Sequence, residues 1–201
     1  MVGDSVTLHT DDTEVPRDSK IIWKFGDEII AKMNEADATP SMLDGPGAIF
    51  KDRLKLDKQT GSLTITNIRP EHIGHYSVDI RSTDAKLKTF QVTVHVGVKA
   101  VSVMEREPVN LDTGVLEIQG YDLIMWKTEG NIVAEVNKGN NLFGPKELED
   151  LRFSGRLHLH RETGDLTISD SKTADSGDFH LHMSNSEYTL QRTIRVIVKS
   201  E

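Results

Sequence analysis

Four histidines stand in two pairs whose spacing suits metal binding. His158 and His160 are two positions apart, and so are His180 and His182. Residues two apart on a β-strand point to the same face, so each pair could offer two imidazole ligands to zinc or copper. Apolar residues occupy the alternate positions in both stretches. The pairs are therefore expected to face solvent, either as plain surface histidines or, for His180 and His182, as a pH-sensitive contact.

No other group of residues has the spacing of a catalytic or cofactor site. The sequence has no cysteine, which removes thiol nucleophiles and thiolate metal ligands. It also lacks the patterns Gly-x-Ser-x-Gly and His-Glu-x-x-His and a glycine-rich phosphate loop before a helix. We therefore predict no catalytic residue, no metal ligand and no cofactor. The chain is predicted not to be an enzyme and to take no small-molecule substrate.

Charge and hydropathy limit the other partners. The 201 residues carry a net charge of −8, with acids and bases mixed along the chain and no basic stripe, so nucleic-acid binding is not expected. No apolar run reaches the roughly 20 residues that span a bilayer. No signal peptide is visible at the start. Any membrane attachment is therefore expected through an anchor outside this fragment, although the absence of cysteine alone points toward a reducing compartment.

An internal repeat sets the domain organisation. The stretch LKLDKQTGSLTITNI at 54–68 recurs as LHLHRETGDLTISDS at 157–171, 103 positions later. The same offset pairs the two tryptophans, and a one-residue slip after about position 88 extends the match to the end of each half. The sequence therefore predicts two homologous domains, 1–97 and 98–201.

Each half has the pattern of short β-strands. Leu54 and Leu56 alternate with polar neighbours, and so do Leu63 and Ile65. A period of two indicates half-buried strands, and the intervening Asp-Lys-Gln-Thr-Gly-Ser favours a hairpin turn. Similar runs recur roughly every 8–12 residues without a convincing amphipathic helix. The predicted fold class is all-β, with two tandem β-sandwiches and a short helical turn possible only in 145–151.

Each half resembles a variable-type immunoglobulin domain. The resemblance rests first on the strand B pattern Ser-Val-Thr-Leu-His-Thr at 5–10. It rests second on a lone tryptophan on strand C, Trp23 or Trp126. It rests third on the corner motif Asp-x-Gly-x-Tyr, which stands as DSGDF in the second half and HIGHY in the first. The gap from Trp to the corner Tyr or Phe is 53 residues in both halves, which leaves room for the additional strands C′ and C″.

The resemblance implies how the two cores are built. The residues at the positions of the missing inter-sheet disulfides are Thr10 with Val78 and Thr113 with Leu181. Each absent crosslink forgoes roughly 4 kcal/mol by the loop-entropy estimate, so packing around the tryptophans has to replace it. A buried threonine hydroxyl can also bond to the backbone.

The corner motif is expected to differ between the halves. Tyr76 and its counterpart Phe179 should both lie in the core. In related domains an arginine at the start of strand D bridges the corner aspartate, and Arg156 and Asp175 can do so. In the first half Arg53 faces a histidine at the aspartate position, so that half should lack the ion pair.

Within this superfamily, RLKLDKQTGSLTI and the preceding Phe-Lys-Asp look most like the membrane-distal domains of SLAM-type lymphocyte adhesion receptors, which often lack the inter-sheet disulfide. This chain departs from that family because both halves are variable-type and cysteine-free, whereas relatives usually add a disulfide-bearing constant-type domain. The resemblance implies that a partner docks on the sheet of strands G, F, C and C′ (the GFCC′ face). The predicted partner-binding residues are Ile22, Lys24, Glu28, Lys32, Ser77, Asp79, Arg81, Lys86, Lys88, Thr89 and Gln91.

From residues alone, that surface is equally well explained as an ordinary solvated sheet, and the resemblance favours binding. The predicted function is an extracellular adhesion or immune-recognition module on a cell-surface protein, binding another immunoglobulin-type domain or a copy of itself. The alternative is a structural domain pair in an intracellular, muscle-type immunoglobulin array, which would suit a cysteine-free chain. Muscle-type domains usually lack C″, so the 53-residue gap favours the first class.

Overall fold

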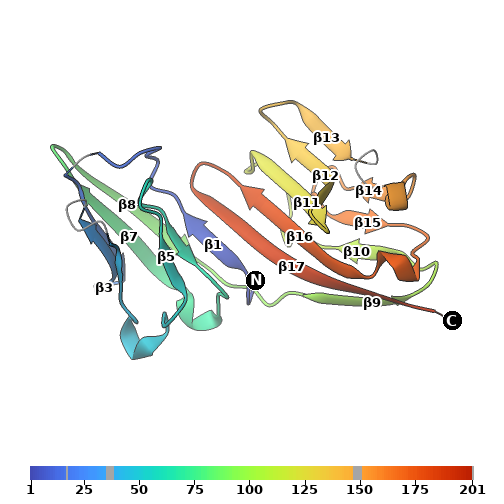
Figure 1. The fold of residues 1–201 in the computed structure, drawn as a ribbon, viewed down its shortest axis with the longest axis horizontal. Coiled ribbons are helices and arrows are strands. Elements are labelled where there is room, and N and C mark those ends of the chain that lie inside the picture. The colour runs from blue at the N-terminus through green and yellow to red at the C-terminus, as the bar shows by residue number, and fades with distance from the viewer. Residues whose placement is uncertain (17, 35–38, 147–150, 201) are drawn as a thin grey trace. The chain divides into compact units, whose positions relative to one another are not determined.

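The computed structural model describes residues 1–16, 18–34, 39–146 and 151–200. The chain divides into two compact units: unit 1 is Met1–Val96 with Ser186–Thr189, and unit 2 is Gly97–Asn185 with Leu190–Glu201. Among the described residues, all regular structure consists of strands and three-residue 3-10 turns (Figure 1). No helix in this part of the chain has the length and hydrophobicity to cross a membrane.

Unit 1 contains two antiparallel sheets. The larger sheet has the order β4-β3-β2-β7-β8, with β2 at its centre. Its strands are β2 (Lys20–Phe25), β3 (Glu28–Asn34), β4 (Ser41–Met42), β7 (Gly74–Arg81) and β8 (Ala85–Val92). The smaller sheet has the order β1-β6-β5, formed by β1 (Ser5–Leu8), β5 (Leu54–Leu56) and β6 (Leu63–Ile65). Two 3-10 turns, Pro46–Ala48 and Pro70–His72, lie in the connections.

Unit 2 repeats this plan and adds one strand. The larger sheet runs β13-β12-β11-β16-β17, with β9 parallel to β17, and the smaller sheet runs β10-β15-β14. The strands of the larger sheet are β9 (Ala100–Met104), β11 (Leu123–Thr128), β12 (Asn131–Asn137), β13 (Leu142–Pro145), β16 (Gly177–Ser184) and β17 (Tyr188–Lys199). The smaller sheet contains β10 (Val109–Leu111), β14 (Leu157–Leu159) and β15 (Leu166–Ile168). The 3-10 turns are Leu151–Phe153 and Thr173–Asp175.

The all-β prediction is confirmed, and the additional strands predicted from the 53-residue gap are present as β3 and β4 in unit 1 and β12 and β13 in unit 2. The helical turn predicted within 145–151 falls mostly on residues 147–150, which lie outside the described residues.

A buried tryptophan is fixed to the opposite sheet in each unit. Trp23 and Trp126 are both 0% exposed. The indole Nε1–H of Trp23 donates to the carbonyl oxygen of Gly61 at 2.9 Å, and Trp126 donates to Gly164 at the same distance. A central tryptophan was predicted. The polar bond from its ring to the β5–β6 or β14–β15 hairpin was not.

A threonine hydroxyl supports the same hairpin in each unit. Thr10 donates to the carbonyl oxygen of Thr60, and Thr113 donates to that of Thr163 at 2.6 Å. Both threonines are buried, at a position where related domains carry a cysteine. We call the tryptophan and threonine bonds to the Thr-Gly carbonyls the indole clamp. It explains why both halves of the repeat keep Thr-Gly between their strands.

The glycine of the clamp is required by space as well as by backbone conformation. Gly61 has φ of +72°, and a Cβ added to it would lie 2.5 Å from Ile21 Cδ1 in the buried core. Gly26, in the β2–β3 hairpin, has φ of +57° and nothing within 4 Å of an added Cβ. The two positions share a left-handed backbone and differ in the room for a methyl group.

Gly61→Ala should therefore lower the free energy of unfolding of unit 1 by more than Gly26→Ala does. The left-handed backbone costs roughly 1–2 kcal/mol at either site. Overpacking against Ile21 adds about 1–3 kcal/mol at Gly61 alone. Amide hydrogen exchange in β7 measures unit 1 separately from unit 2. Equal losses in the two variants would show that the methyl group is accommodated without cost.

Candidate functional site

The side of the larger sheet of unit 1 that points away from the core forms a continuous surface. Directly opposed residues of antiparallel strands share a face. Ile22 is opposed by Asp79 on β7 and by Lys32 on β3, and Asp79 is opposed by Leu87 on β8. We call this surface the outer face. Its residues are Lys20, Ile22, Lys24, Ile29, Lys32, Asn34, Ser41, His75, Ser77, Asp79, Arg81, Leu87, Thr89 and Gln91.

Most of the predicted partner-binding residues lie on this face. Its centre, formed by Ile22, Lys24, Ser77 and Asp79, is half-buried. The remaining predicted members of the face are exposed, and these are Lys32, Arg81, Thr89 and Gln91.

Two predicted residues, Lys86 and Lys88, lie on the opposite side of β8. Lys86 is opposed by Ile80 and Lys88 by Val78, and both partners are buried. The Lys88 ammonium lies 2.5 Å from an Asp11 carboxylate oxygen and 5.1 Å from the centre of the Phe90 ring. These side chains alternate with Leu87 and Thr89, so they do not lie on the outer face. They contact the segment that follows β1 instead.

The same bracing position recurs in unit 2. With the one-residue slip of the repeat, Lys88 corresponds to Arg192, which is 4% exposed. Its guanidinium donates to the carbonyl oxygens of Asp112, at 3.1 Å, and Thr113, at 2.8 Å. An inward-facing cation on the last strand is therefore a structural feature of both units.

Glu28 also lies off the outer face. It is opposed by Phe25, whose ring packs against the core. A bulge between Trp23 and Lys24 shifts the register, so Ile29 becomes the residue opposite Lys24. Strand alternation alone cannot locate such a bulge, which explains the error at Glu28 and the omission of Ile29.

Charge is unevenly distributed on the outer face. Asp79 and Arg81 form an ion pair at 2.7 Å, and the hydrogen bond to Asp79 raises the pKa of Arg81. Among the residues that the structure describes, Lys20, Lys24 and Lys32 take part in no ion pair. The face is thus locally basic on a chain whose net charge is −8.

A shallow hollow lies at the basic end of the outer face. Its volume is about 170 Å³, and most of its lining residues are polar or charged. The lining residues are Lys20, Lys32, Met33, Asn34, Thr39 and Ser41. Lys20 and Leu87 are absent from the predicted partner-binding residues, although both lie on this face near the ends of their strands. Lys20 keeps the alternation of Ile22 and Lys24, and Leu87 keeps that of Thr89 and Gln91.

The histidine pairs of unit 2 lie on different sheets. His158 and His160 belong to β14 in the smaller sheet and are exposed, with their rings 5.0 Å apart. His180 and His182 belong to β16 in the larger sheet. Within the described residues, no group of three or more His, Asp or Glu is placed to hold a metal ion.

His182 differs from the other three histidines because it is half-buried. It is opposed by Met125 on β11, while the exposed His180 is opposed by Lys127 and contacts the Thr193 hydroxyl. Burial, and then the charge of Lys127, lower the pKa of His182 below its ordinary value. The prediction that both members of this pair face solvent is therefore correct for His180 and only partly so for His182.

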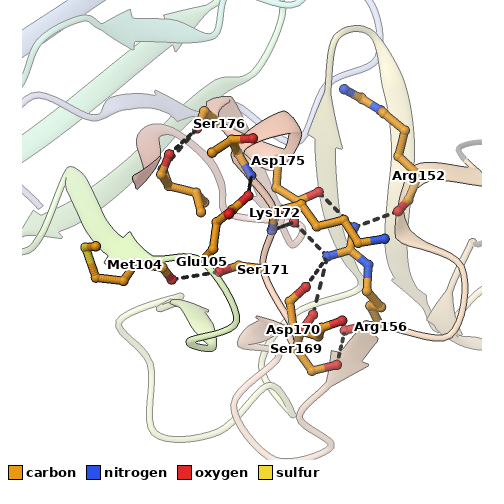
Figure 2. Close-up of polar contacts among 12 residues, drawn as sticks. Met104, Glu105, Arg152, Arg156, Ser169, Asp170, Ser171, Lys172, Asp175 and Ser176 are labelled. Atoms are coloured by element: carbon orange, nitrogen blue, oxygen red, sulfur yellow. Dashed lines mark hydrogen bonds and ion pairs between the residues drawn. The ribbon is translucent and has the colours of Figure 1, made fainter. Parts of the chain in front are cut away.

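The corner of unit 2 is held by the predicted ion pair. Arg156 donates from Nη1 and Nη2 to the two carboxylate oxygens of Asp175, at 2.7 and 2.8 Å, and the Asp175 side chain is 0% exposed (Figure 2). The same guanidinium donates to the carbonyl oxygens of Arg152 and Asp170, while the Lys172 backbone N–H donates to Asp175. This hydrogen bonding to Asp175 raises the pKa of Arg156.

Unit 1 closes the same corner without a carboxylate. His72 accepts the Arg69 backbone N–H on Nδ1, as Asp175 accepts that of Lys172. Its Nε2 therefore carries the proton and donates to the Ile49 carbonyl oxygen at 2.8 Å. The Tyr76 hydroxyl donates to the His72 carbonyl oxygen, and Arg53 bonds to the backbone at Asn67.

In both units a sheet with the order of strands C″, C′, C, F and G faces a sheet of strands B, E and D across a buried tryptophan. This is the arrangement of a variable-type immunoglobulin domain. Each unit thus has an immunoglobulin-like fold.

Known proteins give a likeness of fold only. No protein-family profile and no curated protein matches the sequence. Solved structures similar to this immunoglobulin-like chain include CD84, of the SLAM family, with 19% identity over 52% of this chain and 100% of that chain and a TM-score of 0.44. Murine CEACAM1b matches at 16% identity over 98% and 94% of the chains, with a TM-score of 0.38. A titin Z1Z2 tandem matches at 17% over 98% and 91%, with a TM-score of 0.39.

Arg156→Met should destabilise the second immunoglobulin-like domain far more than Arg53→Met destabilises the first. Removing Arg156 leaves the buried Asp175 without its cation, which typically costs about 3–5 kcal/mol. Removing Arg53 loses a hydrogen bond to a backbone carbonyl, worth about 0.5–1.5 kcal/mol. Hydrogen exchange in β16 and β7 measures the two domains separately. Similar losses would mean that the ion pair adds nothing beyond an ordinary hydrogen bond.

The lowered pKa of His182 predicts a loss of stability in unit 2 below neutral pH. The unfolded chain, with histidine near 6.5, binds more protons than the folded chain as the pH falls through 6.5 toward the folded pKa. The stability that neutral His182 contributes is therefore fully present above pH 6.5 and is lost as the pH falls below it. Imidazole NMR titration should place the pKa of His182 below its ordinary value of 6.5. Unfolding at pH 7.5 and 5.5 should depend less on pH in His182→Gln than in His180→Gln, and equal dependence in the two variants would contradict the assignment.

Proposed function

We propose that this chain is an extracellular recognition module of a cell-surface protein, without catalytic activity, that binds an immunoglobulin-type domain, either of another protein or of a second copy of this chain. Unit 1 is the binding domain and its outer face is the contact surface. The membrane anchor would lie outside the 201 residues. Binding of this kind needs an accessible sheet face, and most residues of the outer face are exposed.

Leu87 is the observation that carries the proposal. Its side chain is 72% exposed on β8, in a strand position where an apolar residue gains nothing from the domain's own core. It lies opposite Asp79 and two positions before Thr89 on the same strand. On its other side Asp79 is opposed by the half-buried Ile22. An apolar anchor ringed by polar and charged groups is the usual composition of a protein contact surface. Charges at the rim supply selectivity and fast association more than affinity.

The alternative, a structural pair in an intracellular array, is favoured by the indole clamp. Because Thr10 and Thr113 hold the hairpins by hydrogen bonds to carbonyl groups, both domains would remain folded where disulfides are reduced. A structural pair has no need of an exposed leucine on the outer face, so mutation at Leu87 distinguishes the two functions.

The test is the binding of fluorescent tetramers of the chain to a panel of leukocyte and epithelial cells, measured by flow cytometry. Leu87→Asp should reduce binding at least tenfold, because a charge replaces the exposed apolar anchor. Leu116→Asp is the matched control, since Leu116 is 94% exposed in a loop of unit 2 and should tolerate the same change. Thermal unfolding should be similar for both variants.

Three outcomes would contradict the proposal. The first is the absence of tetramer binding to any cell in the panel. The second is binding that survives Leu87→Asp. The third is an equal loss in Leu87→Asp and Leu116→Asp. The first outcome would favour the structural alternative.

A further inference from the structure

We propose that the partner of the outer face is an acidic protein surface, and that one of its carboxylate side chains enters the hollow between Lys20 and Lys32. This inference rests on the proposed function and selects a different protein, rather than a second copy of this chain, as the partner. It follows from the charges of the face, the groups that line the hollow and the geometry of self-docking.

The charges of the face are the first argument. Lys20 and Lys24 belong to one strand with Ile22 between them, and Lys32 is opposed by Ile22 on the neighbouring strand. The only described carboxylate on the face, that of Asp79, is bound to Arg81 at 2.7 Å. Three lysines without a described ion-pair partner therefore surround one apolar side chain. A partner that buries Ile22 has to compensate them, since like charges at an interface cost several kcal/mol.

The hollow supplies the second argument. Two lysines, Lys20 and Lys32, line it together with Thr39 and Ser41, whose side chains end in hydroxyl groups. Asn34, which is opposed by Lys20, also lines it. Residues with charged and neutral donor groups around about 170 Å³ suit the acceptor oxygens of an Asp or Glu side chain. The hollow is too small for a domain but large enough for one such group.

Self-docking conflicts with the same charges. A symmetric pair of identical chains joins one patch to itself, so each residue of the patch is repeated across the interface. Such a pair would bring the lysines Lys20, Lys24 and Lys32 of both copies together. The only described acid on each face would be Asp79, which is already paired. An acidic partner removes this repulsion and adds the attraction that speeds association.

A polyanion such as a sulfated glycan is a weaker candidate for two reasons. The lysines alternate with apolar side chains, namely Ile22 and Ile29, and the exposed Leu87 lies on the same face. The chain as a whole has a net charge of −8, which repels a long polyanion. A globular acidic surface of similar size to the face can contact both the lysines and the apolar side chains.

The first experiment uses the tetramer assay with paired charge reversals. Lys20→Glu/Lys32→Glu should reduce cell binding at least tenfold. The matched control is Lys55→Glu/Lys58→Glu, which makes the same change at two exposed lysines of the smaller sheet and its hairpin, and it should bind like the unaltered chain. Binding of the unaltered chain should fall steeply between 50 and 300 mM NaCl, on the order expected for screened charge pairs. The neutral Lys20→Met/Lys32→Met variant should lose most of that salt dependence.

The second experiment uses a defined acidic probe and the chain alone. In an NMR titration, a blocked hexaglutamate peptide should shift the amides of β2, β3 and β4 and leave β5 and β6 unchanged. Equal shifts on both sheets would overturn the assigned site. Sedimentation at 50 mM NaCl should find a monomer, and a dimer that Leu87→Asp abolishes would overturn the choice of an acidic partner while supporting the face itself.

The outcomes separate this inference from the proposed function. If Leu87→Asp abolishes cell binding and Lys20→Glu/Lys32→Glu does not, the face binds a partner but the acidic partner is wrong. If Leu87→Asp has no effect, the proposed function fails first. If heparan sulfate digestion of the cells removes the binding and mild protease treatment does not, the ligand is a polyanion and the inference is overturned.

Discussion

The bond from a buried indole to a glycine carbonyl is the constraint on which the rest of each domain depends. Trp23 stands on the central strand of the larger sheet, and Gly61 lies in the hairpin of the smaller one. The bond therefore fixes how closely the two sheets approach. The side chains of β2 alternate between core and solvent, as the pleat of a β-strand requires. The outer face is the solvent side of that alternation, and the clamp lies on the core side beneath it.

The internal repeat predicted the strands and hairpins of this arrangement, and the errors concern single positions. Periodicity identified the strands, and the duplicated Thr-Gly marked the hairpins, because both signals reside in adjacent residues. The acceptor role of the Gly61 carbonyl was not visible, since a backbone oxygen leaves no trace in residue type. Glu28 was misplaced by a bulge, and Lys88 was misplaced because a lysine reads as solvent-facing although its stem can cover Phe90. Sequence patterns locate a strand better than they locate a register shift or an amphipathic side chain.

The two units perform one structural task with different chemistry. At the corner before β7 and β16, unit 1 uses a neutral imidazole and a tyrosine hydroxyl, and unit 2 uses a bidentate ion pair and a phenyl ring. Both satisfy the same backbone N–H, at Arg69 and Lys172 respectively. Their outer faces diverge as well, with lysines around Ile22 in unit 1 and Met125 beside His182 in unit 2. The two units therefore share their strand arrangement and differ in the residues that face solvent.

Holding the core with an indole and a hydroxyl has a mechanical consequence. A covalent crosslink between positions 10 and 78 would hold back the 67 residues between them when the ends of the domain are pulled apart. At about 3.4 Å per extended residue, that segment represents roughly 230 Å of chain. Here nothing covalent bars its release, so a tensile load that breaks the clamp frees the whole domain. Such a load can therefore extend every residue of the domain, including those that a disulfide would have shielded.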